Sequence, residues 1–339
     1  MKTDGKLIHG SNLKQKENHG TKYRDAESKQ FLGEIRARYD EWLRDNLALI
    51  GPGVKPADTD PETLTKRIKL VEDYKDFIDQ QKYAEKFDSR SNLHSSVLEE
   101  FMFFLFKDLV EELGSHALIG KSHSFKDIFF TPPTYADMLE RPYAKIEIKD
   151  HDFVIGATYK ASFASTVPPS REDEPEEKVE VKMEKTPKDY ETTTVVQKPE
   201  ALQLGLPAAK TESETESHLF DIPAVAIECK TYLDKTMLEG SSRAADEIKA
   251  RHPNGIYIVV MEYIKLTEAV NFKKYKVDQI YVLRKQKNVD REYRYLDTFT
   301  KKPIDLETVI HLFNLVRSHL TTNWSSGVSG GIERGWLIE

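Results

Sequence analysis

Glu228 and Lys230 stand at the end of an otherwise apolar run, Ile222 to Lys230. Residues i and i+2 of a strand point to the same face, so these two side chains project together and Cys229 points into the core. A carboxylate can hold a divalent cation, and a neighbouring ammonium can orient or polarise the water that attacks a phosphodiester. The alternative is a strand end in solvent or a structural ion pair, because Glu-x-Lys triplets occur by chance in many proteins.

An acidic residue upstream could complete this pair. Asp152 opens the apolar run Phe153 to Gly156, and it would lie beside Glu228 if the two strands are adjacent. Asp150 is a rival, because it has the same parity and would share the face of Asp152 if the strand began earlier. We take Asp152 as the first candidate for this acidic residue and Asp150 as the second. Histidine as a residue type has a pKa near neutrality, but a histidine in a hairpin, such as His151, is more often a turn residue than a general base.

The elements around these residues predict a sheet flanked by helices. A helix through Ser241 to Ile248 and a second apolar strand, Ile256 to Met261, follow the strand that ends at Lys230. A strand, a crossover helix and a second strand imply a sheet that is at least partly parallel. Further strands are expected at 144–149, 152–163 and 279–283, and a further helix at 306–320.

Helices are expected ahead of the strands, at 26–50, 61–87 and 95–113, because apolar residues recur there at roughly helical spacing. The stretch 26–90 is therefore interpreted as a helical region. Residues 1–25 are polar and rich in Lys, Gly and Asn. We expect them to form a mobile N-terminal arm.

Two consecutive acidic residues, Glu99 and Glu100, lie on the third of these helices. At about 100° per residue, Glu100 falls opposite the apolar face and is expected to be solvated. Glu99 falls on a flank with little other polarity. A carboxylate there needs a partner, which could be a metal-bound water or an ordinary salt bridge.

Between residues 166 and 217 the composition changes. The segment contains six prolines and the charged run Arg171 to Glu177. Such a composition is typical of a solvated chain, and we expect a long flexible insertion. A loop of about fifty residues inside a compact domain is unusual and normally indicates a function or disorder.

The composition is that of a soluble globular protein, with 339 residues, a formal net charge of -7 and one cysteine. A single cysteine excludes an internal disulfide framework and a thiolate zinc cage. No apolar run approaches the roughly 18 residues that span a bilayer, and the polar N-terminus lacks the features of a signal peptide. We therefore expect a cytoplasmic protein without a membrane partner.

The negative net charge lowers the expectation of a nucleic-acid partner, but binding responds to the local field. Residues 265–302 contain eleven Lys or Arg against five Asp or Glu. This block could contact phosphates, or it could be a sheet edge protected by lysines; we weigh the two equally. The candidate DNA-binding residues are Lys273, Lys274, Lys276, Arg284, Lys285, Lys287, Arg291 and Arg294.

The order Asp-Phe-Val-Ile-Gly, a strand ending Ala-Ile-Glu-Cys-Lys, a crossover helix and an apolar strand resembles the core of the PD-(D/E)xK nuclease superfamily, over about residues 91–263. The resemblance implies that Asp152 and Glu228 bind Mg²⁺ and that Lys230 positions or activates water. The peptide carbonyl of Cys229 could add a metal ligand. Many members also have a glutamate on a helix ahead of the sheet, a position that Glu99 would fill.

The same resemblance implies an α/β fold with a mixed central β-sheet of the restriction-endonuclease-like type, formed by a nuclease domain at 91–339. No Walker-type phosphate loop is present, so the chain most resembles a stand-alone type II restriction endonuclease that cuts double-stranded DNA at a short specific sequence. The fragments Ser96 to Phe101 and Glu228 to Leu238 are similar to the BbvCI-like group. This implies a homodimer or a heterodimer with a second nuclease subunit, and a cognate DNA methyltransferase in the same system.

Two other functions compete with this interpretation. A repair or recombination nuclease of the same fold would recognise DNA structure instead of sequence. A non-catalytic DNA-binding subunit would contain a decayed centre, and the intact set of Asp152, Glu228 and Lys230 argues against decay.

Overall fold

The computed structural model describes residues 6–87, 92–164, 215–289, 291–324 and 332. The chain forms two compact units. Unit 1 consists of residues 1–122, 150–156 and 223–339, and unit 2 consists of residues 123–149 and 157–222. All of the candidate catalytic residues belong to unit 1.

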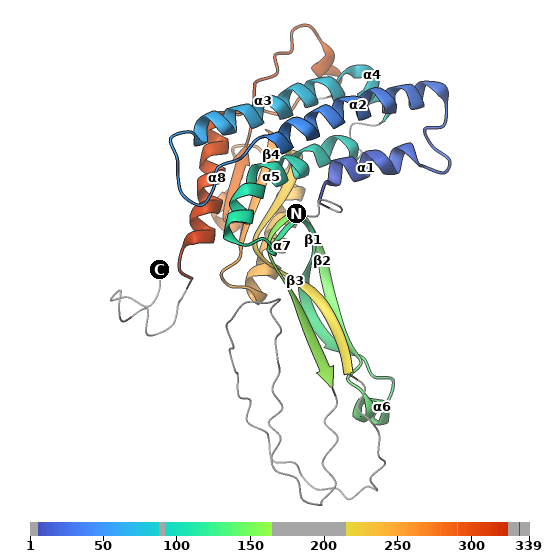
Figure 1. Cartoon of the computed structure of the whole chain (residues 1–339), viewed down its shortest axis with the longest axis vertical. Coiled ribbons are helices and arrows are strands. Elements are labelled where there is room, and N and C mark those ends of the chain that lie inside the picture. The colour runs from blue at the N-terminus through green and yellow to red at the C-terminus, as the bar shows by residue number, and fades with distance from the viewer. Residues whose placement is uncertain (1–5, 88–91, 165–214, 290, 325–331, 333–339) are drawn as a thin grey trace, which may run out of the picture. The chain divides into compact units, whose positions relative to one another are not determined.

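The N-terminal part of unit 1 is a group of packed helices, in which α2 and α3 lie side by side and both α1 and α3 contact α5 (Figure 1). Asp25 begins α2 by accepting a hydrogen bond from the Ser28 N–H at 2.9 Å, and a proline occupies the first turn of α3. The bounds are Ile8–Glu17 for α1, Ala26–Ala48 for α2, Asp60–Ile78 for α3, Gln81–Lys86 for α4 and Asn92–Leu113 for α5.

Helix α1 corrects the expectation of a mobile arm at residues 1–25, because residues 8–17 of this stretch are helical. His9 and Leu13 are fully buried. The first N–H groups of a helix have no partner within it, and here Glu100 accepts those of His9 at 2.9 Å and Gly10 at 3.2 Å. The polar composition of residues 8–17 gave no sign of this helix. The helix is stabilised by its contact with α5, which cannot be read from the local sequence.

In the part of the chain that the structure describes, five strands pair in the order β1-β2-β3-β4-β5, and β3, β4 and β5 are parallel to one another. Helix α7 connects β3 to β4 and packs on β4, which confirms the predicted βαβ unit. The bounds are Leu118–Phe130 for β1, Ala144–Ala164 for β2, Thr215–Leu233 for β3, Lys235–Arg251 for α7, Ile256–Ile264 for β4, Gln279–Val282 for β5 and Leu306–Thr321 for α8. The expected α/β fold with a mixed central sheet and flanking helices is confirmed.

The two faces of the sheet in unit 1 pack into two separate cores. Val225, Ile227 and Cys229 of β3 belong to the core that contains residues of α5 and α8. Ala226 belongs to the core that contains residues of α7. This alternation agrees with the expectation that Cys229 points away from its two charged neighbours.

Unit 2 contains the remaining parts of β1, β2 and β3 together with α6 (Tyr135–Glu140). Thr134 caps α6 by accepting a hydrogen bond from the Asp137 N–H. Ion pairs join Lys126 to Glu147 at 2.5 Å and Arg141 to Glu216 at 3.1 Å. Of the insertion expected at 166–217, residues 215–217 belong to β3, and the rest lies outside the described residues.

Within the part of the chain that the structure describes, no helix combines the length and the apolar character needed to cross a membrane.

Candidate active site

The carboxylates of Asp152, on β2, and Glu228, on β3, both contact the ammonium group of Lys230, which also lies on β3. Lys230 Nζ lies 2.9 Å from Oε1 of Glu228 and 3.3 Å from Oδ2 of Asp152. The three side chains are 24–28% exposed, so a substrate could reach them from solvent. Asp152 thus converges with Glu228 and Lys230, which lie 76 and 78 positions later in the chain, as the predicted pairing of these strands required.

The Asp152 carboxylate is also fixed by the backbone of the neighbouring strand. The N–H of Cys229 donates a hydrogen bond to Oδ2 at 3.0 Å. The Cys229 thiol itself is buried, and burial raises its pKa well above the ordinary value. A buried neutral thiol is a core group, which agrees with the expected role of this side chain.

Electrostatics favour the charged forms of Lys230 and Glu228. Burial disfavours the Lys230 ammonium, but the charges of Asp152 and Glu228 outweigh burial and raise the pKa of Lys230 above its usual value. Burial likewise acts against the Glu228 carboxylate, but the charge of Lys230 and the hydrogen bonds from Tyr257 and Lys230 together outweigh burial, so that the pKa of Glu228 is lowered. Lys230 is therefore a cation at neutral pH in this arrangement, suited to attracting oxygen and not to abstracting a proton.

Glu99 of α5 lies in the electrostatic field of the same cluster. Burial, and next the negative charge of Asp152, raise the pKa of Glu99 to about 7. The positive charges of Lys121 and Lys230 act in the opposite direction. The described residues form no ion pair with Glu99. The salt bridge that was one of the two expectations for Glu99 is thus not observed among the described residues.

Glu100, which the helical projection placed in solvent, is fully buried; that expectation is wrong. Its carboxylate accepts the two N–H groups at the start of α1 and, at 2.9 Å, the hydroxyl of Tyr39. Burial raises the pKa of Glu100 to about 7 in spite of these hydrogen bonds. The projection failed because α1 covers the face of α5 that was assumed to be free.

The two neighbours of Asp152 in sequence have different surroundings. Asp150 is exposed, whereas Asp152 reaches Lys230. His151 was expected in a turn but is a strand residue that is only 5% exposed. Its ring lies 5.9 Å from the ring of Tyr257, at an angle of 73°. The geometry therefore favours Asp152 over Asp150, and it corrects the expectation of a turn histidine.

Sequence reasoning missed one contact at this cluster. The hydroxyl of Tyr257, on β4, donates a hydrogen bond to Oε2 of Glu228. The register pairs Tyr257 with Ala226, two residues before Glu228. The apolar run Ile256 to Met261 predicted this strand, but the register of two parallel strands is not encoded in either of them alone.

The comparison with known proteins gives a family. A family model described as the Bpu10I restriction endonuclease matches residues 90–181 and 206–304, which is more than half of the chain. The chain belongs to the Bpu10I restriction endonuclease family. It is therefore a site-specific endonuclease of the type II restriction class, and the predicted resemblance to PD-(D/E)xK restriction enzymes is confirmed.

A solved structure described as "native BbvCI A2B2 tetramer at low resolution" has the same fold as this Bpu10I-family chain. The alignment covers 94% of this chain and 98% of the other, with a TM-score of 0.57 and 19% sequence identity. A search of the curated proteins finds no match.

The basic block of the Bpu10I-family chain is divided between exposed and buried residues. Five of the eight residues predicted to bind DNA are exposed: Lys273, Lys274, Lys276, Lys285 and Lys287. Lys285 forms an ion pair with Asp305 at 2.8 Å. Arg294 is half-buried, 4.8 Å from the centre of the Tyr263 ring. The side chain of Arg291 lies outside the described part of the structure.

Arg284 is a correction to the predicted DNA-binding set. It is 1% exposed and forms ion pairs with Glu262 at 2.9 Å and Glu72 at 2.8 Å. Lys75 also contacts Glu262, at 2.8 Å. A buried charge requires such partners, and this one is unavailable to a phosphate. Arg284 was assigned to the DNA-binding set because its acidic partners, Glu72 and Glu262, lie on other elements and cannot be recognised from the basic segment alone.

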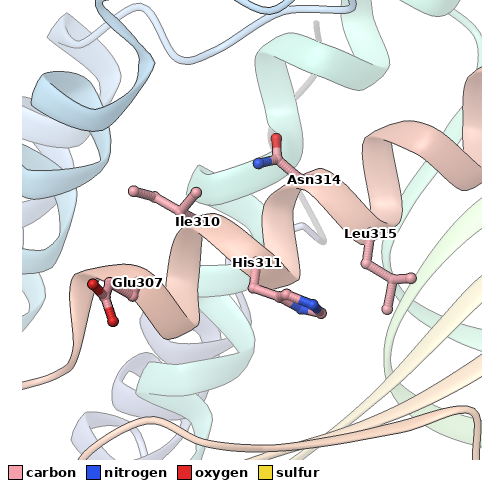
Figure 2. Close-up of a pocket in the computed structure, with 5 residues that line it drawn as sticks. All are labelled: Glu307, Ile310, His311, Asn314 and Leu315. Carbon is pink, nitrogen blue, oxygen red and sulfur yellow. The ribbon is translucent and has the colours of Figure 1, made fainter.

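A pocket on α8 does not coincide with the cluster. Glu307, Ile310, His311, Asn314 and Leu315 line it (Figure 2). His311 lies 2.8 Å from the hydroxyl of Tyr281. None of the candidate catalytic residues belongs to this lining.

Proposed function

We propose that this restriction endonuclease hydrolyses phosphodiester bonds of double-stranded DNA in a Mg²⁺-dependent reaction at the cluster of Asp152, Glu228 and Lys230. The observation that carries the proposal is the convergence of two carboxylates on one ammonium, at 2.9 and 3.3 Å, from two adjacent strands. In a nuclease family, this is the arrangement that could hold a cation and direct water at the same place.

The residues present fit Mg²⁺. This ion prefers oxygen ligands and usually keeps several waters, so one or two carboxylates suffice. Among the described residues, none donates a hydrogen bond to Oδ1 of Asp152, which leaves that oxygen available as a ligand. The described residues contain no group of three or more Asp, Glu, His or Cys placed to hold a metal, so a site closed by protein side chains is not expected.

Asp152 and Glu228 would hold the ion, and the peptide carbonyl of Cys229 would be a further ligand. When bound, the ion would supply Lewis-acid stabilisation of the charge that develops on the phosphate. Lys230 would donate a hydrogen bond that orients the attacking water, and its positive charge would favour the approach of the phosphate. Glu99 would hold a second water near Asp152, because its half-buried carboxylate has no ion-pair partner among the described residues.

DNA would be bound by exposed lysines of the basic block, in particular Lys273, Lys274 and Lys276. A single centre cuts one strand, so cleavage of both strands would require two centres. A homodimer or a heterodimer with a second nuclease subunit would provide them, in line with the A2B2 tetramer of the BbvCI structure. A cognate DNA methyltransferase would protect the host sites.

The test is incubation of the purified protein with several different plasmids and Mg²⁺, with and without EDTA. We expect discrete fragments that disappear with EDTA and with Glu228→Gln. A smear would indicate a nuclease without sequence specificity, and cutting that survives EDTA would refute the metal requirement. The protein is also to be assayed after co-expression with the gene products adjacent to its own, since absence of cutting under both conditions would refute the proposal.

A further inference from the structure

Tyr257 contacts the proposed metal ligand Glu228 from the neighbouring strand. Its hydroxyl donates a hydrogen bond to Oε2, whereas Oε1 lies 2.9 Å from Lys230 Nζ. The two oxygens of one carboxylate thus have two different partners on opposite sides. A carboxylate held in this way has a defined rotation, which a single contact would not give it.

Tyr257 is itself held in place by the sheet. The residue is 1% exposed, and its N–H donates a hydrogen bond to Asp278 at 2.7 Å. The His151 ring packs against the phenol ring at 5.9 Å. In the β3–β4 register Tyr257 stands beside Ala226, whose small side chain leaves room for the phenol to extend forward to Glu228. A phenol fixed on all these sides can impose its position on the carboxylate.

We propose that Tyr257 is a positioning residue of the metal centre, which holds Oε2 of Glu228 and so fixes the rotation that turns Oε1 toward Lys230. The inference rests on the proposed role of Glu228 as a metal ligand. Carboxylates that bind metals are commonly fixed by hydrogen bonds from outside the ligand set, and loss of such a partner typically weakens metal binding by about 10- to 100-fold. Tyr257 acts through Glu228, so it need not touch DNA.

The test removes one oxygen atom. We expect Tyr257→Phe to weaken the binding of Mn²⁺ to the DNA-free protein by about tenfold or more, measured from the electron paramagnetic resonance signal of the free ion. Tyr281→Phe is the matched control, because it removes a hydroxyl from a buried tyrosine of the same sheet whose partner is His311. We expect the control to bind Mn²⁺ as the wild type does. Thermal unfolding of both variants separates metal binding from folding.

A double-mutant cycle with Glu228→Gln decides whether Tyr257 acts through Glu228. We expect Tyr257→Phe to have no further effect on Mn²⁺ binding in the Glu228→Gln background. Equal binding by Tyr257→Phe and the wild type would overturn the inference and leave the proposed function intact. Wild-type binding that does not depend on Glu228 would instead refute the proposed function itself.

A second variant covers the case in which Tyr257→Phe does not fold. Incorporation of 4-aminophenylalanine at position 257 retains a hydrogen-bond donor on the same ring. We expect this variant to bind Mn²⁺ more tightly than a folded Tyr257→Phe, or within tenfold of the wild type if the phenylalanine variant is unfolded. A folded amino variant that binds Mn²⁺ more than 100-fold more weakly than the wild type would contradict the role of the donor.

Discussion

Lys230 occupies the place at which the proposed mechanism is most sensitive to a single side chain. Both carboxylates of the cluster contact its ammonium. In the proposed mechanism, its removal would leave the attacking water without a donor. We expect Lys230→Ala to lower the rate of DNA cleavage by about 10²- to 10³-fold while DNA binding persists. Cleavage of a plasmid and a gel-shift assay measure the two effects.

The control for Lys230→Ala is Lys235→Ala, which removes an exposed lysine at the start of α7. We expect cleavage by the control to be unchanged. An unfolded Lys230→Ala protein, as judged by circular dichroism, would favour the structural ion pair over the catalytic role.

Glu99 offers a second residue-level prediction, in which activity and stability change in opposite directions. Its carboxylate is largely buried beside the charge of Asp152, which disfavours the ionised form. Glu99→Gln should therefore lower cleavage and raise the free energy of unfolding at pH 8 by about 1 kcal/mol, after allowance for solvent screening. Urea denaturation without metal checks the second effect. A destabilised variant would show that Glu99 has a stabilising partner.

The main residues of the cluster could be predicted from the sequence, and their contacts could not. Parity along a strand placed Glu228 with Lys230, and the pairing of adjacent strands placed Asp152 near both. Tyr257 was missed because its role depends on the register between β3 and β4. Arg284 was misassigned because acidic residues elsewhere in the chain decide whether an arginine is free or buried.

At the scale of elements, the contact between α1 and α5 makes folding depend on pH. Burial raises the pKa of Glu100 to about 7, above the value of about 4.5 expected for an unfolded chain. Between these values the folded state binds more protons than the unfolded state, so this group's contribution to stability is lost as the pH rises. Hydrogen bonds from His9, Gly10 and Tyr39, and the nearby charge of Arg36, favour the ionised form and limit the effect.

Glu100→Gln isolates this contribution, because glutamine has no proton to exchange. From pH 4.5 to pH 8 we expect the wild type to lose about 3 kcal/mol of unfolding free energy relative to the variant. Urea denaturation at several pH values, for both proteins, measures the difference. A constant difference across this range would mean that the hydrogen bonds fully offset burial and leave the pKa of Glu100 unshifted.

The elements that the sequence did not predict share a physical reason. In α1 the polar side chains conceal the buried His9 and Leu13. In β1 the buried positions include Ser122 and Ser124, so the apolar alternation typical of a strand is absent. Where apolar periodicity was strong, as in α2, β4 and α8, the expected elements are present within a few residues of their predicted bounds. The expectation that rested on composition alone, a mobile arm at residues 1–25, agrees poorly with the structure.

At the scale of the whole molecule, DNA binding by a chain of net charge -7 must depend on local positive charge. We expect substitution of Lys273, Lys274 and Lys276 by alanine to reduce the salt dependence of DNA binding. Each phosphate contact that is lost lowers the slope of log K against log salt by about 0.9. Gel shifts at several salt concentrations measure this slope. Lys66→Ala is the control, because Lys66 is an exposed lysine outside the basic block that pairs with Glu62, and an unchanged triple variant would place the DNA elsewhere.

The two consecutive glutamates of α5 face different tasks, since Glu99 lies in the field of the catalytic cluster and Glu100 receives the start of α1. Adding or deleting one residue in the first turns of α5 would rotate everything before that point by about 100° relative to the rest. An insertion between Ser96 and Glu100 would therefore turn Ser96, whose hydroxyl lies 3.1 Å from Nδ1 of His9, away from the helix α1 that Glu100 also contacts. Relatives that share this arrangement should therefore vary in length before Asn92 or beyond α5, and hold the spacing between Ser96 and Glu100 unchanged.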